Sequence, residues 1–395
     1  MLSSSSSPRK MVPTVIAFGI CQIIGWGVTF NLPGVIGSSI AEEFNSSLGR
    51  VLLGPTLMLV ILALVSWWMV PLFERYGARN LMIAGAVVMV IGLAIISIAP
   101  SVEVYLASWI LFGIGGAASL STAAQIALVD IFGDGASQAI SAMSLVSGLS
   151  NTIMWPIISR IEMAFGWRTV IVVCGVALVV IYVPLVWIFG ARESRAKADS
   201  TSTDVNERER LDPVRFALVA GVTALNGFIT WGFSLTLIPL LINKGLEQSQ
   251  AVTLASLLGL VSLAARFIDI VGTWTPLRSA IAATFGLLMS FVLLYLGSSV
   301  TVAVMFILLY GLSGGLMAVV RATLPLAIFP ARAYGRASAR LALPMNLAFS
   351  AARPVFASIL ANHGAESALF VAMVLGTAAL ICVVGLALRV HRGFM

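Results

Sequence analysis

Charged residues are scarce in this chain. Asp, Glu, Lys and Arg make up only 10% of its 395 residues, whereas 59% are hydrophobic and the mean hydropathy is +1.04. Soluble domains carry about 25% charged residues, and no soluble core needs this much apolar surface. The composition therefore excludes an ordinary soluble domain and predicts an integral membrane protein.

Histidine, cysteine and phosphate-binding loops are also nearly absent. His363 and His391 fall near an expected outer loop and in the C-terminal tail, so neither predicts a buried triad or metal cluster. Cys21, Cys174 and Cys382 fall in apolar segments without paired spacing, which argues against a disulfide or metal framework. No Gly-rich loop with a following Lys occurs, so ATP is not the evident energy source. We predict that the protein is not an enzyme and has no cofactor.

Long apolar segments fill most of the chain instead. A spanning helix takes about 20 residues, and Gly, Pro and charge breaks divide the sequence into twelve such segments. The chain is thus predicted to be an all-α polytopic membrane protein. The expected spans are 12–40, 48–70, 81–99, 103–131, 137–163, 168–190, 213–243, 248–271, 278–297, 300–329, 334–362 and 367–390.

The second half of the sequence repeats the first. FGIGG at 112–116, with Trp-Pro at 155–156, returns as YGLSG at 310–314 with Arg-Pro at 353–354. Such duplication predicts two pseudosymmetric six-helix halves, and duplicated membrane halves usually enclose a substrate site at their interface. The predicted division is an N-terminal half over 1–190, a polar cytoplasmic linker over 191–212 and a C-terminal half over 213–395.

Lys and Arg predict the orientation in the membrane. With the N-terminus inside, sixteen of these residues fall in cytoplasmic segments and four in outer segments, so both termini are expected in the cytoplasm. The net charge of +7 is therefore a topological signal and not a nucleic-acid-binding surface. The polar start has no small-residue cleavage site, which indicates an uncleaved first helix. We expect the protein in a bacterial inner (plasma) membrane.

The loop after the second span carries a family signature. Residues 70–79, VPLFERYGAR, resemble the Gly-x-Leu-x-Asp-Arg-x-Gly-Arg-Arg loop of the major facilitator superfamily, with Glu in place of Asp. The resemblance covers essentially the whole chain and implies a secondary transporter. It also implies a conformational latch between this loop and an acid at the cytoplasmic end of the fourth helix. The latch residues are Glu74, Arg75, Gly77, Arg79 and Asp130; the alternative is that they are only interfacial charges.

Two features of proton-coupled exporters are missing from their expected places. The arginine that such exporters often carry in the fourth helix would fall at Trp109, and the fifth-helix Gly-Pro-x-x-Gly-Gly signature of drug antiporters is replaced by WPIISR at 155–160. Both absences weaken a drug/proton antiporter interpretation without excluding export.

Three arginines lie at membrane depth, and intramembrane charges are costly and usually functional. Arg353, Arg321 and Arg266 are these candidates for substrate binding, while Asp269 is the acid within a span near them. For each arginine a structural role stays open: bonding of carbonyls near a proline for Arg353, a latch to an acid such as Asp130 for Arg321, and a local pair with Asp269 for Arg266. Asp269 is also the candidate for proton coupling.

Neutral polar and aromatic residues complete the predicted pocket. Asn346 and Ser350 recur with Arg353 at i, i+4 and i+7, which puts all three on one helix face. Packing or an interfacial position is the alternative for each tryptophan. The other predicted substrate-binding residues are Gln22, Trp26, Thr29, Gln125, Asn151, Trp155, Asn226, Thr230 and Trp231.

Guanidinium groups bind planar carboxylates through two hydrogen bonds. We therefore predict a monomeric secondary transporter of a small organic anion, a carboxylate, with rocker-switch alternating access and proton symport. A loose resemblance to the monocarboxylate and oxalate/formate branch implies a cation in the eighth helix, where Arg266 lies. Two alternatives stay open: an efflux carrier for a toxic or hydrophobic metabolite or drug, and a transporter-like receptor without flux.

Overall fold

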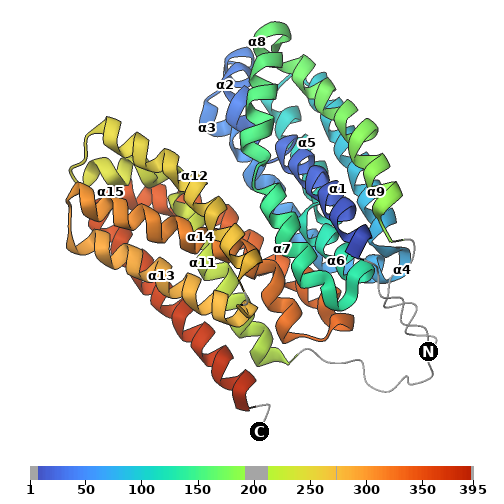
Figure 1. Cartoon of the computed structure of the whole chain (residues 1–395). Coiled ribbons are helices and arrows are strands. Elements are labelled where there is room, and N and C mark those ends of the chain that lie inside the picture. The colour runs from blue at the N-terminus through green and yellow to red at the C-terminus, as the bar shows by residue number, and fades with distance from the viewer. Residues whose placement is uncertain (1–7, 192–211, 273, 393–395) are drawn as a thin grey trace. The chain divides into compact units, whose positions relative to one another are not determined.

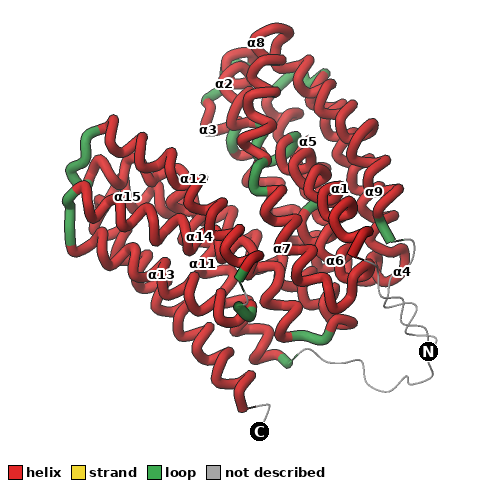
Figure 2. Tube along the Cα trace, viewed as in Figure 1, coloured by secondary structure: helices red, strands yellow, loops and turns green. Residues whose placement is uncertain are grey.

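The structure is a computed structural model, and it describes residues 8–191, 212–272 and 274–392. Every regular element in these ranges is helical (Figures 1 and 2), in agreement with the predicted all-α membrane fold. The helices are α1 (Pro8–Gly27), α2 (Pro33–Glu43), α3 (Leu48–Val51), α4 (Leu53–Ser97), α5 (Val102–Ser119), α6 (Ser121–Phe132), η1 (Gly133–Gly135), α7 (Ala136–Ser147), α8 (Ser150–Ala177), η2 (Leu178–Tyr182), α9 (Val183–Phe189), α11 (Pro213–Asn243), α12 (Gln248–Val271), α13 (Pro276–Leu296), α14 (Val300–Ile328) and α15 (Ala331–Arg392).

Three of these helices continue from one predicted span into the next. α4 passes through Gly77 at a φ of 77°, α8 through Gly166 at 78° and α15 through Gly364 at 79°. A positive φ in this range strains residues that carry a Cβ, so each glycine allows a sharp kink. Among the described residues, eight helices are long and apolar enough to cross a membrane, and Met11–Gly27 is a shorter apolar helix. With the three kinks, this arrangement is consistent with twelve spans.

The chain divides into two compact units. Unit 1 comprises Met1–Arg208 and Ala331–Leu343, and unit 2 comprises Glu209–Pro330 and Pro344–Met395. α15 therefore belongs to both units, and the change falls at Pro344, which cannot donate a helix hydrogen bond. Most of the predicted linker 191–212 lies outside the described residues.

Close backbone contact holds α4 against α5 in unit 1. A Cβ placed on Gly85 would lie 2.5 Å from the carbonyl oxygen of Gly115 and 2.9 Å from Cβ of Ala118. Small residues let membrane helices approach this closely, and the resulting van der Waals contacts drive helix association in lipid. Gly85 and Gly115 therefore set the spacing of the two helices.

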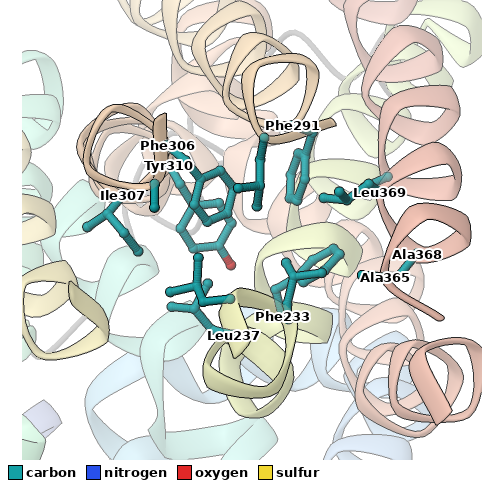
Figure 3. Close-up of a cluster of buried hydrophobic side chains, with 14 of the residues drawn as sticks. Phe233, Leu237, Phe291, Phe306, Ile307, Tyr310, Ala365, Ala368 and Leu369 are labelled. Carbon is teal, nitrogen blue, oxygen red and sulfur yellow. The ribbon is translucent and has the colours of Figure 1, made fainter. Parts of the chain in front are cut away.

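Aromatic side chains form the core of unit 2 (Figure 3). Phe233 of α11 lies 4.9 Å from Phe291 of α13 and 4.5 Å from Phe356 of α15, measured between ring centroids. Phe291 in turn contacts Tyr310 of α14 with a centroid distance of 5.9 Å. The Tyr310 hydroxyl donates to the backbone oxygen of Thr230 at 2.9 Å. This core joins α14 and α15, which carry Arg321 and Arg353, to α11 and α13.

An ion pair in unit 1 joins the end of α2 to α8, just after the kink of α8. Glu43, at the end of α2, accepts from Nη2 of Arg168 and Nε1 of Trp167, each at 2.6 Å. Arg168 also donates to the carbonyl oxygens of Ser97 at 2.7 Å and Ala99 at 3.1 Å. One arginine thus connects α2, the end of α4 and the second part of α8.

This ion pair predicts a pH dependence of stability. The hydrogen bond from Arg168 lowers the pKa of Glu43 below its ordinary value near 4.5. Such a carboxylate stabilises the fold above its unfolded pKa, and the contribution is lost as pH falls through the lower folded pKa. We expect the thermal unfolding temperature of detergent-solubilised protein to fall as pH drops below about 4.5, and Arg168→Gln to flatten that fall. Equal pH slopes for the two proteins would contradict this assignment; the effect is modest because both side chains are partly exposed.

Candidate functional site

Two of the three candidate arginines join a row of stacked side chains in unit 2. The Arg353 guanidinium carbon lies 5.4 Å from the Trp231 ring centroid. The Trp231 ring stacks on Phe349, with 4.9 Å between centroids and an interplanar angle of 9°. The Arg321 guanidinium carbon lies 5.3 Å from the Phe349 centroid. We call Arg353, Trp231, Phe349 and Arg321 the arginine–aromatic stack; it joins α11, α14 and α15.

The third arginine and the acid lie on α12, beside this stack. Arg321 donates from Nε to the carbonyl oxygen of Met317 at 3.2 Å, and Arg266 is near enough for the two like charges to interact. Asp269 follows Arg266 by three residues and accepts a hydrogen bond of 2.6 Å from the Ser279 hydroxyl of α13. The three arginines therefore belong to one unit, and Asp269 is tied to a neighbouring helix.

The polar side chains on α11 form most of their hydrogen bonds with the backbone of α11 itself. Thr230 donates to the carbonyl oxygen of Asn226 at 2.9 Å. Asn226 is fully buried and donates to Val222 O at 2.8 Å and to the Thr284 hydroxyl of α13 at 3.2 Å. Its Oδ1 accepts no hydrogen bond from the described residues. Asn226 therefore faces α13 and keeps one acceptor for a further donor.

On α15, the predicted polar face of Asn346, Ser350 and Arg353 ends at Arg353, which belongs to the arginine–aromatic stack. Ser350 is buried and donates to the carbonyl oxygen of Leu347 at 2.9 Å. Asn346, one turn earlier, is half-buried. Arg353, one turn after Phe349, is half-buried as well, so the charged end of the stripe reaches the Trp231 ring.

A second polar cluster lies in unit 1, between α1 and α6. Trp26 donates from Nε1 to the Ser121 hydroxyl at 3.0 Å, and that hydroxyl lies 3.4 Å from Oε1 of Gln22. Gln22 is 1% exposed, and its Nε2 has no hydrogen-bond partner among the described residues. Thr29, just after α1, donates to the carbonyl oxygen of Gly25. Gln22 thus offers a buried donor next to an indole.

The remaining predicted residues of unit 1 are more dispersed. Trp155 is 42% exposed and donates to the carbonyl oxygen of Asn31 at 3.3 Å. The side chain of Asn151 lies outside those that the structure describes. Gln125 accepts from the Tyr334 hydroxyl at 3.4 Å, so this amide contacts the first part of α15.

The predicted latch residues have partners of several kinds. Glu74 pairs with Arg336 of α15 at 3.6 Å, and both side chains are partly exposed. Arg79 is 6% exposed and its guanidinium carbon lies 4.0 Å from the Trp187 ring centroid. Gly77 provides the kink of α4.

The other two latch residues are Arg75 and Asp130. The Arg75 guanidinium carbon lies 5.2 Å from its neighbouring Tyr76 ring. Asp130 is half-buried near the end of α6.

Several site residues were missed at the sequence level. Phe349 is an apolar residue and Ser121 is a small hydroxyl residue, and each lies in an apolar helix. Neither residue type indicates a functional role by itself. Tyr334 and Arg336 follow the expected cytoplasmic end of α14, and Arg336 counted only as a topological charge. Phe349 precedes Arg353 by four residues, which places the two side chains on the same helix face. This spacing was the sequence feature that could have pointed to Phe349.

Chemically, unit 2 offers cations and aromatic faces, and unit 1 offers neutral donors and acceptors. Guanidinium groups provide forked donors for carboxylates. Among the residues that the structure describes, no group of three or more His, Cys, Asp or Glu residues could hold a metal ion.

Comparison with known proteins finds a matching family and similar solved structures. The model described as Major Facilitator Superfamily matches residues 18–338. The human organic anion transporter MFSD10 (TETRAN) has 15% identity and a TM-score of 0.69, over 96% of this chain and 100% of that one. The proton:xylose symporter XylE, bound to 6-bromo-6-deoxy-D-glucose, has 15% identity and a TM-score of 0.74, over 95% of each chain. No curated protein matches the sequence significantly.

Proposed function

Because the chain belongs to the major facilitator superfamily, whose members are membrane transporters and not enzymes, we propose that it carries a small organic anion across the membrane. The substrate class is a carboxylate, and the transport cycle is rocker-switch alternating access between the two sequence halves. The observation that supports the anion is the arginine–aromatic stack together with Arg266.

Charge decides between the substrates that this fold accommodates. One similar structure is an organic anion transporter and another is a proton:xylose symporter, so the fold alone does not select the substrate. Three arginines of unit 2, Arg266, Arg321 and Arg353, lie at membrane depth, and Asp269 is the acid within a span near them. Intramembrane cations attract anions strongly because the surroundings screen charge poorly. This excess of cations favours an anion over a neutral sugar.

The remaining features of the proposal concern topology and coupling. Residues 1–190 and 213–395 are the two moving halves, joined by the linker 191–212, with both termini in the cytoplasm of a bacterial cell. The protein works as a monomer in the inner membrane. The loop at 70–79 and Asp130 regulate opening on the cytoplasmic side, and a proton accompanies the anion by binding Asp269.

Counterflow in proteoliposomes tests the substrate class. Purified protein is reconstituted into vesicles loaded with unlabelled compound, and uptake of labelled carboxylates, a neutral sugar and a lipophilic cation is measured. We expect saturable exchange of at least one carboxylate and none above protein-free vesicles for the other classes. Exchange of the lipophilic cation alone would instead establish the efflux carrier.

Proton coupling is tested in the same vesicles. An imposed inward proton gradient should drive uphill carboxylate uptake by the wild type. Asp269→Asn should retain counterflow, which needs no net proton movement, but should lose gradient-driven accumulation. Normal accumulation by this variant would show that Asp269 does not carry the proton.

A further inference from the structure

The arginine–aromatic stack combines two nearly parallel rings with two cation–π contacts. Its rings come from α11 and α15, which are far apart in sequence, yet lie nearly parallel at 4.9 Å. Both guanidinium groups lie over ring faces, within the range in which a cation and a π system attract each other. Phe349 is 6% exposed, so the inner ring is shielded from water and lipid.

Glycine on α11 makes room for this stack. A Cβ placed on Gly227 would collide with Cε1 of the Phe349 ring, and one on Gly232 would collide with Cδ2 of the Phe356 ring. Phe349 therefore lies directly against the bare backbone of α11. The fold provides two matched glycine–phenylalanine contacts, one inside the stack and one in the aromatic core.

The stack gives each of its arginines a cation–π contact. The ring has a quadrupole and no net charge, so this contact leaves the positive charge of the guanidinium unchanged. Arg353 and Arg321, at the two ends of the stack, carry one positive charge each. A monovalent anion matches one of these charges, and a divalent anion matches both.

We infer that Trp231 and Phe349 are positioning residues that hold Arg353 and Arg321 as a paired cationic site, which selects substrates carrying two anionic groups. This inference rests on the proposed function and names its substrate class as dicarboxylates. Each arginine binds one carboxylate, and the intervening rings set the separation of the two groups.

A length series of acids tests the pairing. Inhibition of counterflow is measured in wild-type proteoliposomes for α,ω-dicarboxylates of increasing chain length and for monocarboxylates of equal length. We expect an optimum length at which the dicarboxylate binds at least about tenfold more tightly than its monocarboxylate, as one additional charge-assisted contact provides. Monocarboxylates that bind as well as every dicarboxylate would overturn the paired site while leaving an anion carrier in place. Absence of exchange with any acid would instead refute the proposed function.

Variants test the positioning role. Phe349→Leu should raise the KM for the optimal dicarboxylate about tenfold, with little change in maximal rate or in the KM for monocarboxylates. Phe349→Tyr keeps the ring face and should restore the preference. Phe356→Leu is the matched control, because Phe356 is fully buried in the aromatic core and lies against Gly232. Equal effects of Phe349→Leu and Phe356→Leu on both acid classes would show that the stack is only packing. Should either leucine variant fail to fold, the wild-type length series still decides the inference.

Discussion

Arg353→Gln is expected to reduce carboxylate counterflow by at least about tenfold, and the reduction should lie in apparent affinity. Glutamine retains hydrogen-bonding ability but removes the charge and the planar fork that binds carboxylate. A hydrogen bond to a charged group contributes about 1.5–3 kcal/mol, which corresponds to roughly 10-fold to 150-fold in binding. Arg353→Lys should be intermediate, because lysine restores the charge without the fork or the flat face over Trp231.

Arg50→Gln provides the matched control for this change. Arg50 forms an ion pair of 2.8 Å with Glu103, and both side chains are more than half exposed. Exposed pairs contribute little, so counterflow by Arg50→Gln should match the wild type. If Arg353→Gln exchanges carboxylates as the wild type does, Arg353 is not a substrate ligand, and its role near Pro354 is structural.

The helical membrane fold could be predicted from the sequence because apolar length and spacing are the physical requirements of a span. The interruptions of helices within the predicted spans could not be predicted. The first predicted span is divided between α1 and α2, and the fourth is divided at Ser119 between α5 and α6. Such breaks depend on local backbone geometry, and an apolar segment has the same hydropathy whether or not its helix is interrupted.

Some residues of the candidate site could likewise be predicted from the sequence, and others could not. Arg353, Arg321 and Arg266 could be selected because charge at membrane depth is costly. Phe349 could not, because phenylalanine is unremarkable in a span and its contact with Trp231 joins residues more than a hundred positions apart. Periodicity places a residue on a helix face, but it does not say which other helix that face meets.

Gly85→Ala is expected to destabilise unit 1 by about 1–3 kcal/mol or more, as overpacking does where neighbours cannot move. The added Cβ would lie 2.5 Å from the carbonyl oxygen of Gly115, which is backbone and part of α5. The helices would have to separate, and the surrounding van der Waals contacts that hold them in lipid would weaken. Thermal unfolding in detergent, followed by intrinsic fluorescence, should show a Tm several degrees below the wild type.

Gly175→Ala makes the same chemical change in the same unit with a different outcome. A Cβ at Gly175 would lie 3.9 Å from Cδ1 of Leu93, which is ordinary van der Waals contact. Alanine favours a helix over glycine by up to about 1 kcal/mol, so this variant should match or exceed the wild-type Tm. Equal Tm values for Gly85→Ala and Gly175→Ala would contradict the close contact between α4 and α5. Opposite shifts would show that backbone approach, and not helix propensity, makes glycine necessary at position 85.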